Sequence, residues 1–258
     1  MEKVIAIALQ KGGVGKTTTT CNLAATLAKK GKKVLIVDMD SQGNVLFSFG
    51  RNPDSQESSI WEVMTKGVPI QKAIVSVYKN IDVITSSDDL SGLDVHIIQH
   101  LSDYPKPYNL LEIAIKPLRN EYDFILLDLP PALDLKTLNG LTAADGVLIP
   151  VQCELYAIRG VHKLLETIST IQESFNPDLK IMGMVPTMFS TGTNLAAIAL
   201  QEINKIGTEN NVRVFESKIR RYVRYAEAPM FNGPAVLVQK KPEEVEDYVK
   251  LTKEVFGV

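Results

Sequence analysis

Short, almost unbroken apolar runs recur along the chain and alternate with stretches of helical periodicity. The clearest runs are Val4–Leu9, Val34–Val37, Ile81–Ile84, Phe124–Leu127 and Val147–Val151, and weaker ones are Ile181–Val185 and Val212–Phe215. A run without polar alternation predicts a strand that is buried on both faces, which is typical of a parallel sheet covered by helices.

Helical spacing fills the intervals between these runs. Lys16–Lys30 carries Leu23, Ala24 and Leu27 at helical spacing and is followed by Gly31 as a stop. Further helices are predicted at Ile158–Phe175, Asn194–Ile206 and Pro242–Val255. Strand–helix alternation indicates βαβ units, so we expect an α/β fold with a mostly parallel twisted sheet and helices on both faces.

Two segments lack this regularity. Residues Gly50–Ser59 are polar and rich in turn formers, which favours a surface loop, and residues 86–109 form an irregular region in which we expect one short helix. The 258 residues allow one domain or two by length alone. Because no repeat or Pro/Gly linker divides the chain, we expect a single domain over residues 1–258.

Composition excludes several classes of protein. Hydrophobic residues make up 45% and charged residues 22%, which argues against a disordered or collagen-like chain. The formal net charge of −2 gives no sign of a nucleic-acid partner, so DNA binding would require a local basic patch. No apolar stretch reaches the length of a membrane span, and we expect a cytoplasmic protein.

Cysteines and histidines offer little for metal binding. Cys21 and Cys153 form no CxxC pair, which argues against a zinc or iron–sulfur site within one chain and fits a reducing cytosol. A disulfide between them stays open at this point. His96 and His100 are four residues apart but lack an accompanying carboxylate motif, which favours a pair on a helix surface.

The most informative segment is residues 10–18, QKGGVGKTT, which follows the first strand and opens the first helix. Its glycines let successive N–H groups turn toward an anion, and the helix N-terminus adds a partial positive charge. Lys16 can reach the β- and γ-phosphates of a nucleotide, and the Thr17 hydroxyl can ligate Mg²⁺. The residues predicted to bind the nucleotide are Lys11, Gly12, Gly13, Val14, Gly15, Lys16, Thr17 and Thr18.

One position departs from the general phosphate-loop pattern. Gln10 stands where a glycine is usual, and Lys11 adds a second lysine inside the loop. Lys11 is either a solvated loop charge or a second cation that is aimed at a phosphate on a neighbouring subunit.

Three aspartates complete the predicted site. Asp128 ends the buried strand FILLD, and a carboxylate at this edge of a parallel sheet is placed to hold a Mg²⁺ water. Asp38 and Asp40 follow the second strand. In an extended chain residues i and i+2 point the same way, so both carboxylates can face the cleft.

Several separated motifs resemble one family. Residues 11–18, KGGVGKTT, resemble the deviant Walker A box shared by the ParA/Soj partition ATPases, MinD and the nitrogenase iron protein. The ParA/Soj branch is favoured by further matches in the right order. They are residues 38–44 (DMDSQGN), 124–131 (FILLDLPP), 150–154 (PVQCE), 187–189 (TMF) and 227–229 (EAP).

The resemblance implies a P-loop NTPase fold, ATP hydrolysis with Mg²⁺ and a role for each matching residue. Asp40 matches the residue that positions or activates the attacking water, and Asp38 the one that supports the Mg²⁺ shell and the phosphate-loop lysine. Lys11 matches the signature lysine that reaches a partner's nucleotide in an ATP-sandwiched homodimer. Thr187 matches a position near the adenine. The predicted catalytic residues are Lys11, Lys16 and Asp40, and the predicted metal ligands are Thr17, Asp38 and Asp128.

ParA/Soj proteins bind DNA without sequence preference in the ATP-bound state, and the resemblance implies the same here. The candidate contacts are Lys218, Arg220, Arg221 and Arg224. Arg221 and Arg224 match family arginines, whereas Arg220 stands where the family usually has proline. Gly192 stands where the family often carries an arginine, so one expected DNA contact is absent. The alternative interpretation is a solvated basic loop.

The resemblance also implies a ParB-type centromere-binding partner that stimulates hydrolysis, and nucleoid association in the ATP-bound state. Only nine residues precede Gln10, which leaves no room for the N-terminal helix-turn-helix domain of larger plasmid proteins. The short, Soj-like type is therefore expected.

Two other functions compete. A MinD-like membrane ATPase would end in a basic amphipathic helix, but Pro242–Val255 has five acidic residues and two lysines, which an anionic membrane repels. We therefore expect no stable membrane association. A ligase resembling dethiobiotin synthetase would need a substrate pocket in residues 86–109.

Overall fold

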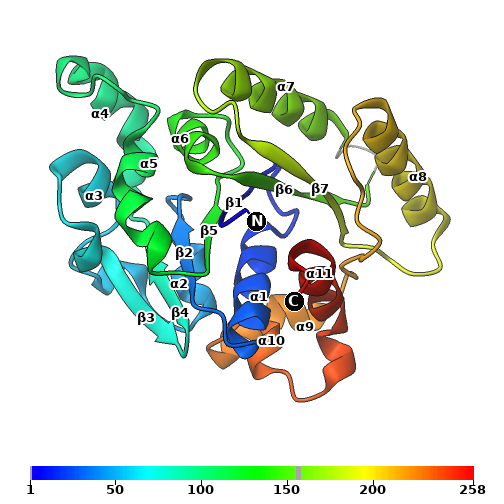
Figure 1. Ribbon diagram of the computed structural model, residues 1–258. Coiled ribbons are helices and arrows are strands. Elements are labelled where there is room, and N and C mark those ends of the chain that lie inside the picture. Colours follow the sequence, from blue (N-terminus) through cyan, green and yellow to red (C-terminus); the bar gives the residue numbers. More distant parts are fainter. Residues whose placement is uncertain (1, 155–157) are drawn as a thin grey trace.

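The computed structural model describes residues 2–154 and 158–258, and these form an α/β fold around one sheet (Figure 1). Within the described residues the sheet has seven strands in the order β3-β4-β2-β5-β1-β6-β7. Every neighbouring pair is parallel except β3 with β4. The strands are β1 (Val4–Ile7), β2 (Val34–Asp38), β3 (Ile74–Tyr78), β4 (Ile81–Ile84), β5 (Phe124–Asp128), β6 (Gly146–Gln152) and β7 (Lys180–Thr187).

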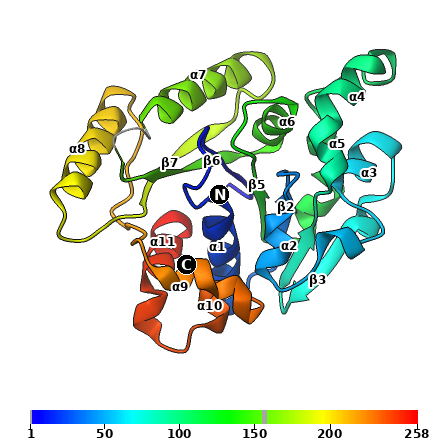
Figure 2. The ribbon, with the colours of Figure 1, turned by 180° about the vertical axis from the view of Figure 1, so that it is seen from behind.

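Helices cover both faces of the sheet, as the views from the front and from behind show (Figures 1 and 2). One face packs against α3 (Ile60–Lys66), α4 (Leu93–Gln99), α5 (Leu110–Ile115), α6 (Leu135–Ala143), α7 (Ile158–Ser174) and α8 (Asn194–Glu209). The other packs against α1 (Lys16–Lys29), α2 (Asn44–Ser48), α9 (Val223–Glu227), α10 (Ala235–Val238) and α11 (Glu246–Phe256).

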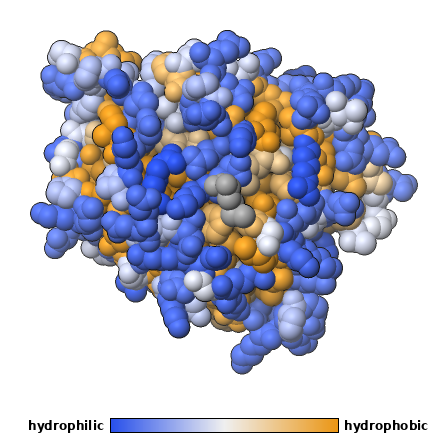
Figure 3. Space-filling model, viewed as in Figure 1, coloured by the Kyte–Doolittle hydropathy of each residue, from blue (hydrophilic) through white to orange (hydrophobic). Residues whose placement is uncertain are grey.

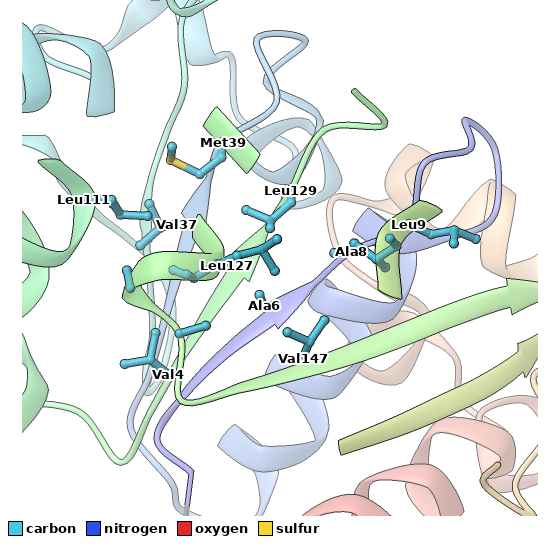
Figure 4. Packing of buried hydrophobic residues seen from close by; sticks show 14 of the residues in the cluster. Val4, Ala6, Ala8, Leu9, Val37, Met39, Leu111, Leu127, Leu129 and Val147 are labelled. Carbon is cyan, nitrogen blue, oxygen red and sulfur yellow. The ribbon is translucent and has the colours of Figure 1, made fainter. Parts of the chain in front are cut away.

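Successive strand residues enter the two cores in turn, which explains why the apolar runs are unbroken. On β1, Val4 and Ala6 lie in the first core with Leu127 and Val147 of the neighbouring strands (Figure 4). Ile5 and the other alternate residues lie in the second core. A strand whose two faces both lie in a hydrophobic core has no polar face. The predicted α/β fold, with a mostly parallel sheet and helices on both faces, is confirmed.

The position of β1 creates the functional crevice. β1 lies between β5 and β6, and the sheet extends from it toward β2 on one side and β7 on the other. In open α/β sheets, ligands bind outside the carboxyl ends of the strands at such a reversal point. The loop after β1 therefore opens onto this crevice.

The predicted strands are confirmed except for Val212–Phe215, which was wrong. That segment pairs with β7 in a single isolated bridge, between Met184 and Val214, and does not extend into a strand. The backbone of this segment lies close against β7 at Gly183, because a Cβ atom added to Gly183 would lie 2.8 Å from the Arg213 carbonyl oxygen. The edge strand β3 was missed, because its residues are half-buried or exposed and leave no continuous buried run.

The predicted helices are confirmed at α1, α7 and α8, and residues 86–109 contain the short helix α4. Pro242–Val255 divides into a 3-10 turn (Pro242–Glu244) and α11. The helices that were not predicted are α2, α3, α5, α6, α9 and α10. Gly50–Ser59 is loop apart from one 3-10 turn at Pro53–Ser55.

Cys21 and Cys153 are buried free thiols that lie in different cores, on opposite faces of the sheet. The disulfide that the sequence left open therefore does not form. In the described residues no helix is both long enough and apolar enough to cross a membrane. On the face shown in Figure 3, apolar patches are interspersed among hydrophilic side chains.

Candidate functional site

The loop between β1 and α1 has the geometry of an anion cradle. Gly13 and Gly15 adopt φ of 74° and 86°, a left-handed backbone that favours glycine and turns the chain sharply. Gly15 caps α1 without a side-chain hydrogen bond, so the first N–H groups of α1 remain directed into the crevice. The Lys16 ammonium folds over the loop and donates to the Lys11 carbonyl at 3.2 Å.

The end of β5 supplies a buried carboxylate beside this loop. Asp128 stands in register with Ile7 of β1 and with Asp38 of β2, so the sheet itself brings both aspartates to one edge. The Thr17 hydroxyl donates to Asp128 Oδ2 at 2.6 Å, and the Thr20 hydroxyl donates to Oδ1 at 3.0 Å. Thr20 was missed, although its spacing of three from Thr17 places it on the same face of α1.

β2 ends at Asp38, so Asp40 lies beyond the extended strand on which the prediction relied. Its charge still acts on Lys16, Asp38 and Asp128, so Asp40 lies near the same edge of the sheet. The Asp38 carboxylate turns back and accepts from the backbone N–H groups of Asp40 and Val45, both at 3.0 Å. Asp40 lies in the following turn, half-buried, and accepts from the Gln42 N–H at 3.2 Å. Asp38 thus fixes the turn that presents Asp40.

Burial dominates the electrostatics of this edge. It raises the pKa of Asp38 well above its usual value, and the neighbouring Asp128 charge raises it further. It raises the pKa of Asp128 to about 6, against the lowering effect of the two threonine hydroxyls and Lys16. Burial also lowers the pKa of Lys16, which Asp128 and Asp40 partly offset. The negative charges of Asp38 and Asp128 are therefore not fully balanced by Lys16, and a bound cation would stabilise them.

These donors fit Mg²⁺. The threonine hydroxyl and the carboxylate beside it are the hard oxygen ligands that Mg²⁺ prefers, and Mg²⁺ usually keeps several waters and substrate phosphates in its shell. In the described part of the chain, no group of three or more His, Cys, Asp or Glu side chains could hold a metal without such help. Thr17 and Asp128 would hold the ion, with Asp38 behind them.

The raised pKa of Asp128 predicts a pH-dependent contribution of Mg²⁺ to ATP binding. Below about pH 6 a proton occupies the carboxyl that the ion needs. We expect Mg²⁺ to tighten ATP binding at pH 7.5, and this gain to shrink by about tenfold per pH unit below 6. Titration calorimetry with and without Mg²⁺ measures the gain. Asp128→Asn, run in parallel, corrects for protonation of ATP itself, and a pH-independent gain would contradict the prediction.

A cavity of about 360 Å³ adjoins the phosphate loop. Val14, Gly15 and Thr18 line one side, and Thr187 lines another, where its hydroxyl donates to the Val14 carbonyl at 2.9 Å. The rest of the lining comes from Met188, residues 219–223, Tyr225, Ala226 and Tyr248. The structure therefore brings Thr187 to the loop, and the apolar, aromatic lining suits a flat heterocycle.

Residues 218–224, which we call the basic segment, contribute residues 219–223 to the lining of this cavity. Their backbone is fixed to the chain after β7, because Phe189 N–H donates to the Ile219 carbonyl at 3.0 Å and Arg221 N–H donates to the Phe189 carbonyl at 2.9 Å. Arg221 and Arg224 are exposed. The Lys218 ammonium lies 5.4 Å from the centroid of the Phe189 ring.

Arg220 and Arg224 both meet buried carboxylates, since Arg224 Nη2 lies 3.7 Å from Glu244 Oε1, but Arg220 is held more closely. Its Nε contacts both carboxylate oxygens of the buried Asp247, at 3.0 and 2.9 Å, and its backbone N–H donates to the same group. Tyr225 adds a hydrogen bond to Asp247 at 3.2 Å. The charge of Arg220 is thus balanced inside the protein, so its DNA contact stays a prediction with less support than that of Arg221.

The backbone conformation at Gly192 favours glycine at the position where the family often carries an arginine. Its φ is +81°, in open space, and side chains other than glycine rarely adopt this backbone.

Lys11 does not point into its own loop. Its ammonium donates to Gln152 Oε1 at 2.9 Å and lies 3.4 Å from Glu154 Oε2, at the end of β6. Sequence reasoning missed Glu154 as a partner of Lys11, since 143 residues separate them.

Comparison with known proteins agrees with this geometry. The model of the AAA domain family matches residues 2–181. Over 255 residues the chain is 39% identical to the chromosome partitioning protein ParA of Myxococcus xanthus, covering 98% of this chain and 88% of that protein. Over 256 residues it is 38% identical to the sporulation initiation inhibitor protein Soj of Bacillus subtilis, covering 99% and 98%.

A solved structure extends the likeness to a bound state. The cobyrinic acid a,c-diamide synthase of Mycobacterium smegmatis, with a bound ATP analogue and magnesium, aligns with a TM-score of 0.85 and 33% identity, covering 98% of this chain and 93% of that one. The aligned region includes nearly the whole chain. The chain therefore belongs to the AAA domain family and, within it, to the ParA/Soj group of partitioning ATPases.

Proposed function

We propose that this ATPase segregates DNA by an ATP-controlled dimer cycle. The observation that carries the proposal is the cavity beside the phosphate loop, which residues 219–223 of the basic segment line. One short stretch of chain thus contacts the nucleotide site on one side and presents cations on the other. Such a stretch can make DNA binding depend on the nucleotide, which agrees with the partitioning relatives.

Phosphoryl transfer needs mainly positioning and charge neutralisation. Lys16 and the N–H groups at the start of α1 hold the phosphates of ATP, and Thr187 lies beside the base. Mg²⁺, held by Thr17 and Asp128, neutralises charge on the phosphates. Asp40, the more accessible of the two β2-edge carboxylates, orients the attacking water.

Dimerisation follows from the direction of Lys11. Because its ammonium leaves its own loop, it can meet a phosphate on a second chain, and two chains then enclose two ATP molecules. The paired basic segments bind double-stranded DNA through its phosphates, without sequence preference. Hydrolysis, stimulated by a ParB-type centromere-binding protein, separates the chains and releases the nucleoid.

A ligase is the second candidate, because the structurally similar M. smegmatis protein is a cobyrinic acid a,c-diamide synthase. Such an enzyme would turn over ATP only with a small acid and an amine donor, independently of DNA. ATP turnover that rises with DNA and a centromere-binding partner, and not with such metabolites, distinguishes partition from amide synthesis.

DNA binding tests the proposal directly. We expect tight binding to a labelled duplex with ATP or a slowly hydrolysed analogue, and weak binding with ADP, measured by fluorescence anisotropy. Arg221→Ala should lower the slope of log affinity against log salt by about 1 for each chain, because one phosphate contact is lost. Arg51→Ala removes an equally charged exposed side chain outside the segment and serves as the control. Failure of the wild type to bind DNA with ATP at low salt would reject the proposal.

A further inference from the structure

The Glu154 carboxylate lies between two cations, Lys11 and Arg221, which have separate roles in the proposed function. Glu154 Oε2 lies 3.4 Å from the Lys11 ammonium, and Glu154 Oε1 lies 3.9 Å from Arg221 Nη2. Lys11 belongs to the phosphate loop and Arg221 to the basic segment. Gln152 braces the group, since its Nε2 donates to Glu154 Oε1 at 2.7 Å while its Oε1 accepts from Lys11 at 2.9 Å.

We infer that Glu154 is a positioning residue that acts as an internal counter-ion for Lys11 and Arg221. In the chain without ligands its carboxylate occupies the place that phosphate oxygens take: a nucleotide phosphate of a second chain for Lys11, and a DNA phosphate for Arg221. Both phosphates must displace Glu154. This inference rests on the proposed function.

The exposure of the group suits a displaceable contact. The side chains of Lys11, Glu154 and Arg221 are 27%, 39% and 63% exposed, so water screens their attraction. Exposed pairs of this kind contribute little to stability, and a phosphate can replace the carboxylate at small cost. The pair of Arg220 with Asp247 is the opposite case, because the carboxylate is only 11% exposed and also accepts from Tyr225.

The topology explains why one residue can reach both cations. Glu154 follows β6, which pairs with β1 on one side and β7 on the other. The phosphate loop leaves β1, and the basic segment is bonded to the chain that leaves β7. A side chain just beyond β6 therefore lies between the two segments, and Glu154 can form ion pairs with Lys11 on one and Arg221 on the other.

Glu154→Gln tests the inference, with Glu243→Gln as its matched control. Both changes remove one negative charge near the basic segment, but the exposed Glu243 side chain forms no ion pair within the described residues. For protein without nucleotide, we expect Glu154→Gln to bind a labelled duplex about two- to fivefold more tightly than Glu243→Gln. Its salt slope should be steeper by about 0.9, because one arginine per chain becomes available.

The Lys11 side of the inference has its own measurement. Light scattering with ATP should detect Glu154→Gln dimers at about two- to fivefold lower protein concentration than wild-type or Glu243→Gln dimers. Thermal melting verifies the fold, and Glu154→Ala provides a second variant with the same expectation. Equal behaviour of the Glu154 and Glu243 variants in both assays overturns the inference while the proposed function stands. A wild type that neither dimerises nor binds DNA with ATP overturns both.

Discussion

Lys11→Ala is expected to abolish ATP-dependent dimerisation while leaving ATP bound to the single chain. The reason lies in the different directions of the two loop lysines. Lys16 folds over its own loop, whereas the Lys11 ammonium lies at Gln152 and Glu154. Removal of a charge that meets a desolvated phosphate at an interface weakens association by about 2–5 kcal/mol, or about 30- to 4,000-fold.

Light scattering with ATP measures this loss, and titration with a fluorescent nucleotide verifies that the single chain still binds. Lys30→Ala removes an exposed lysine at the other end of α1 and should dimerise as the wild type does. A Lys11→Ala dimer of wild-type stability would show that Lys11 is only a solvated loop charge.

Asp40→Ala is expected to trap the ATP-bound dimer. Asp40 lies in the turn after β2, and its carboxylate accepts one hydrogen bond, from the Gln42 N–H. Its replacement by alanine leaves the contacts of Asp38 with the Asp40 and Val45 N–H groups, which fix the turn. Nucleotide binding and dimerisation should therefore persist. Without a carboxylate to orient water, turnover should fall by about 10² or more.

Phosphate release and light scattering on the same sample test both halves of this prediction. Asp54→Ala removes an exposed aspartate from the 3-10 turn at Pro53–Ser55 and should leave both readouts at the wild-type level. Wild-type turnover in Asp40→Ala would remove Asp40 from the mechanism.

Local sequence was sufficient for the groups whose place depends on one strand and the loop after it. Asp128 could be predicted because a buried parallel strand that ends in a carboxylate must place it at the crevice edge. The same holds for Lys16 and Thr17, which are positioned by the turn at Gly15. In each case the local backbone alone brings the residue to the crevice edge, and the contact between Thr17 and Asp128 then follows from the pairing of β1 with β5.

Contacts across the sheet could not be predicted in this way. Glu154 meets Lys11, and Asp247 meets Arg220, only after strands and helices far apart in sequence have packed. Charge counting along residues 218–224 therefore treated Arg220 and Arg221 alike, although one is held by a buried carboxylate and the other is exposed. Similarly, the strand pattern missed β3 because a half-exposed edge strand needs no continuous apolar run.

The shared wall of the cavity limits how this protein can vary. Ile219 and Tyr225 are buried and line the cavity, whereas Arg221 and Arg224, between them in sequence, are exposed. A change of DNA affinity by substitution within 219–225 must preserve the two buried ends of this stretch, Ile219 and Tyr225, which bound the cavity. Mutational tolerance along this stretch should consequently be highest at the exposed residues 221–224 and lowest at the two buried ends. Insertions should be tolerated poorly, because they would displace one buried end relative to the other.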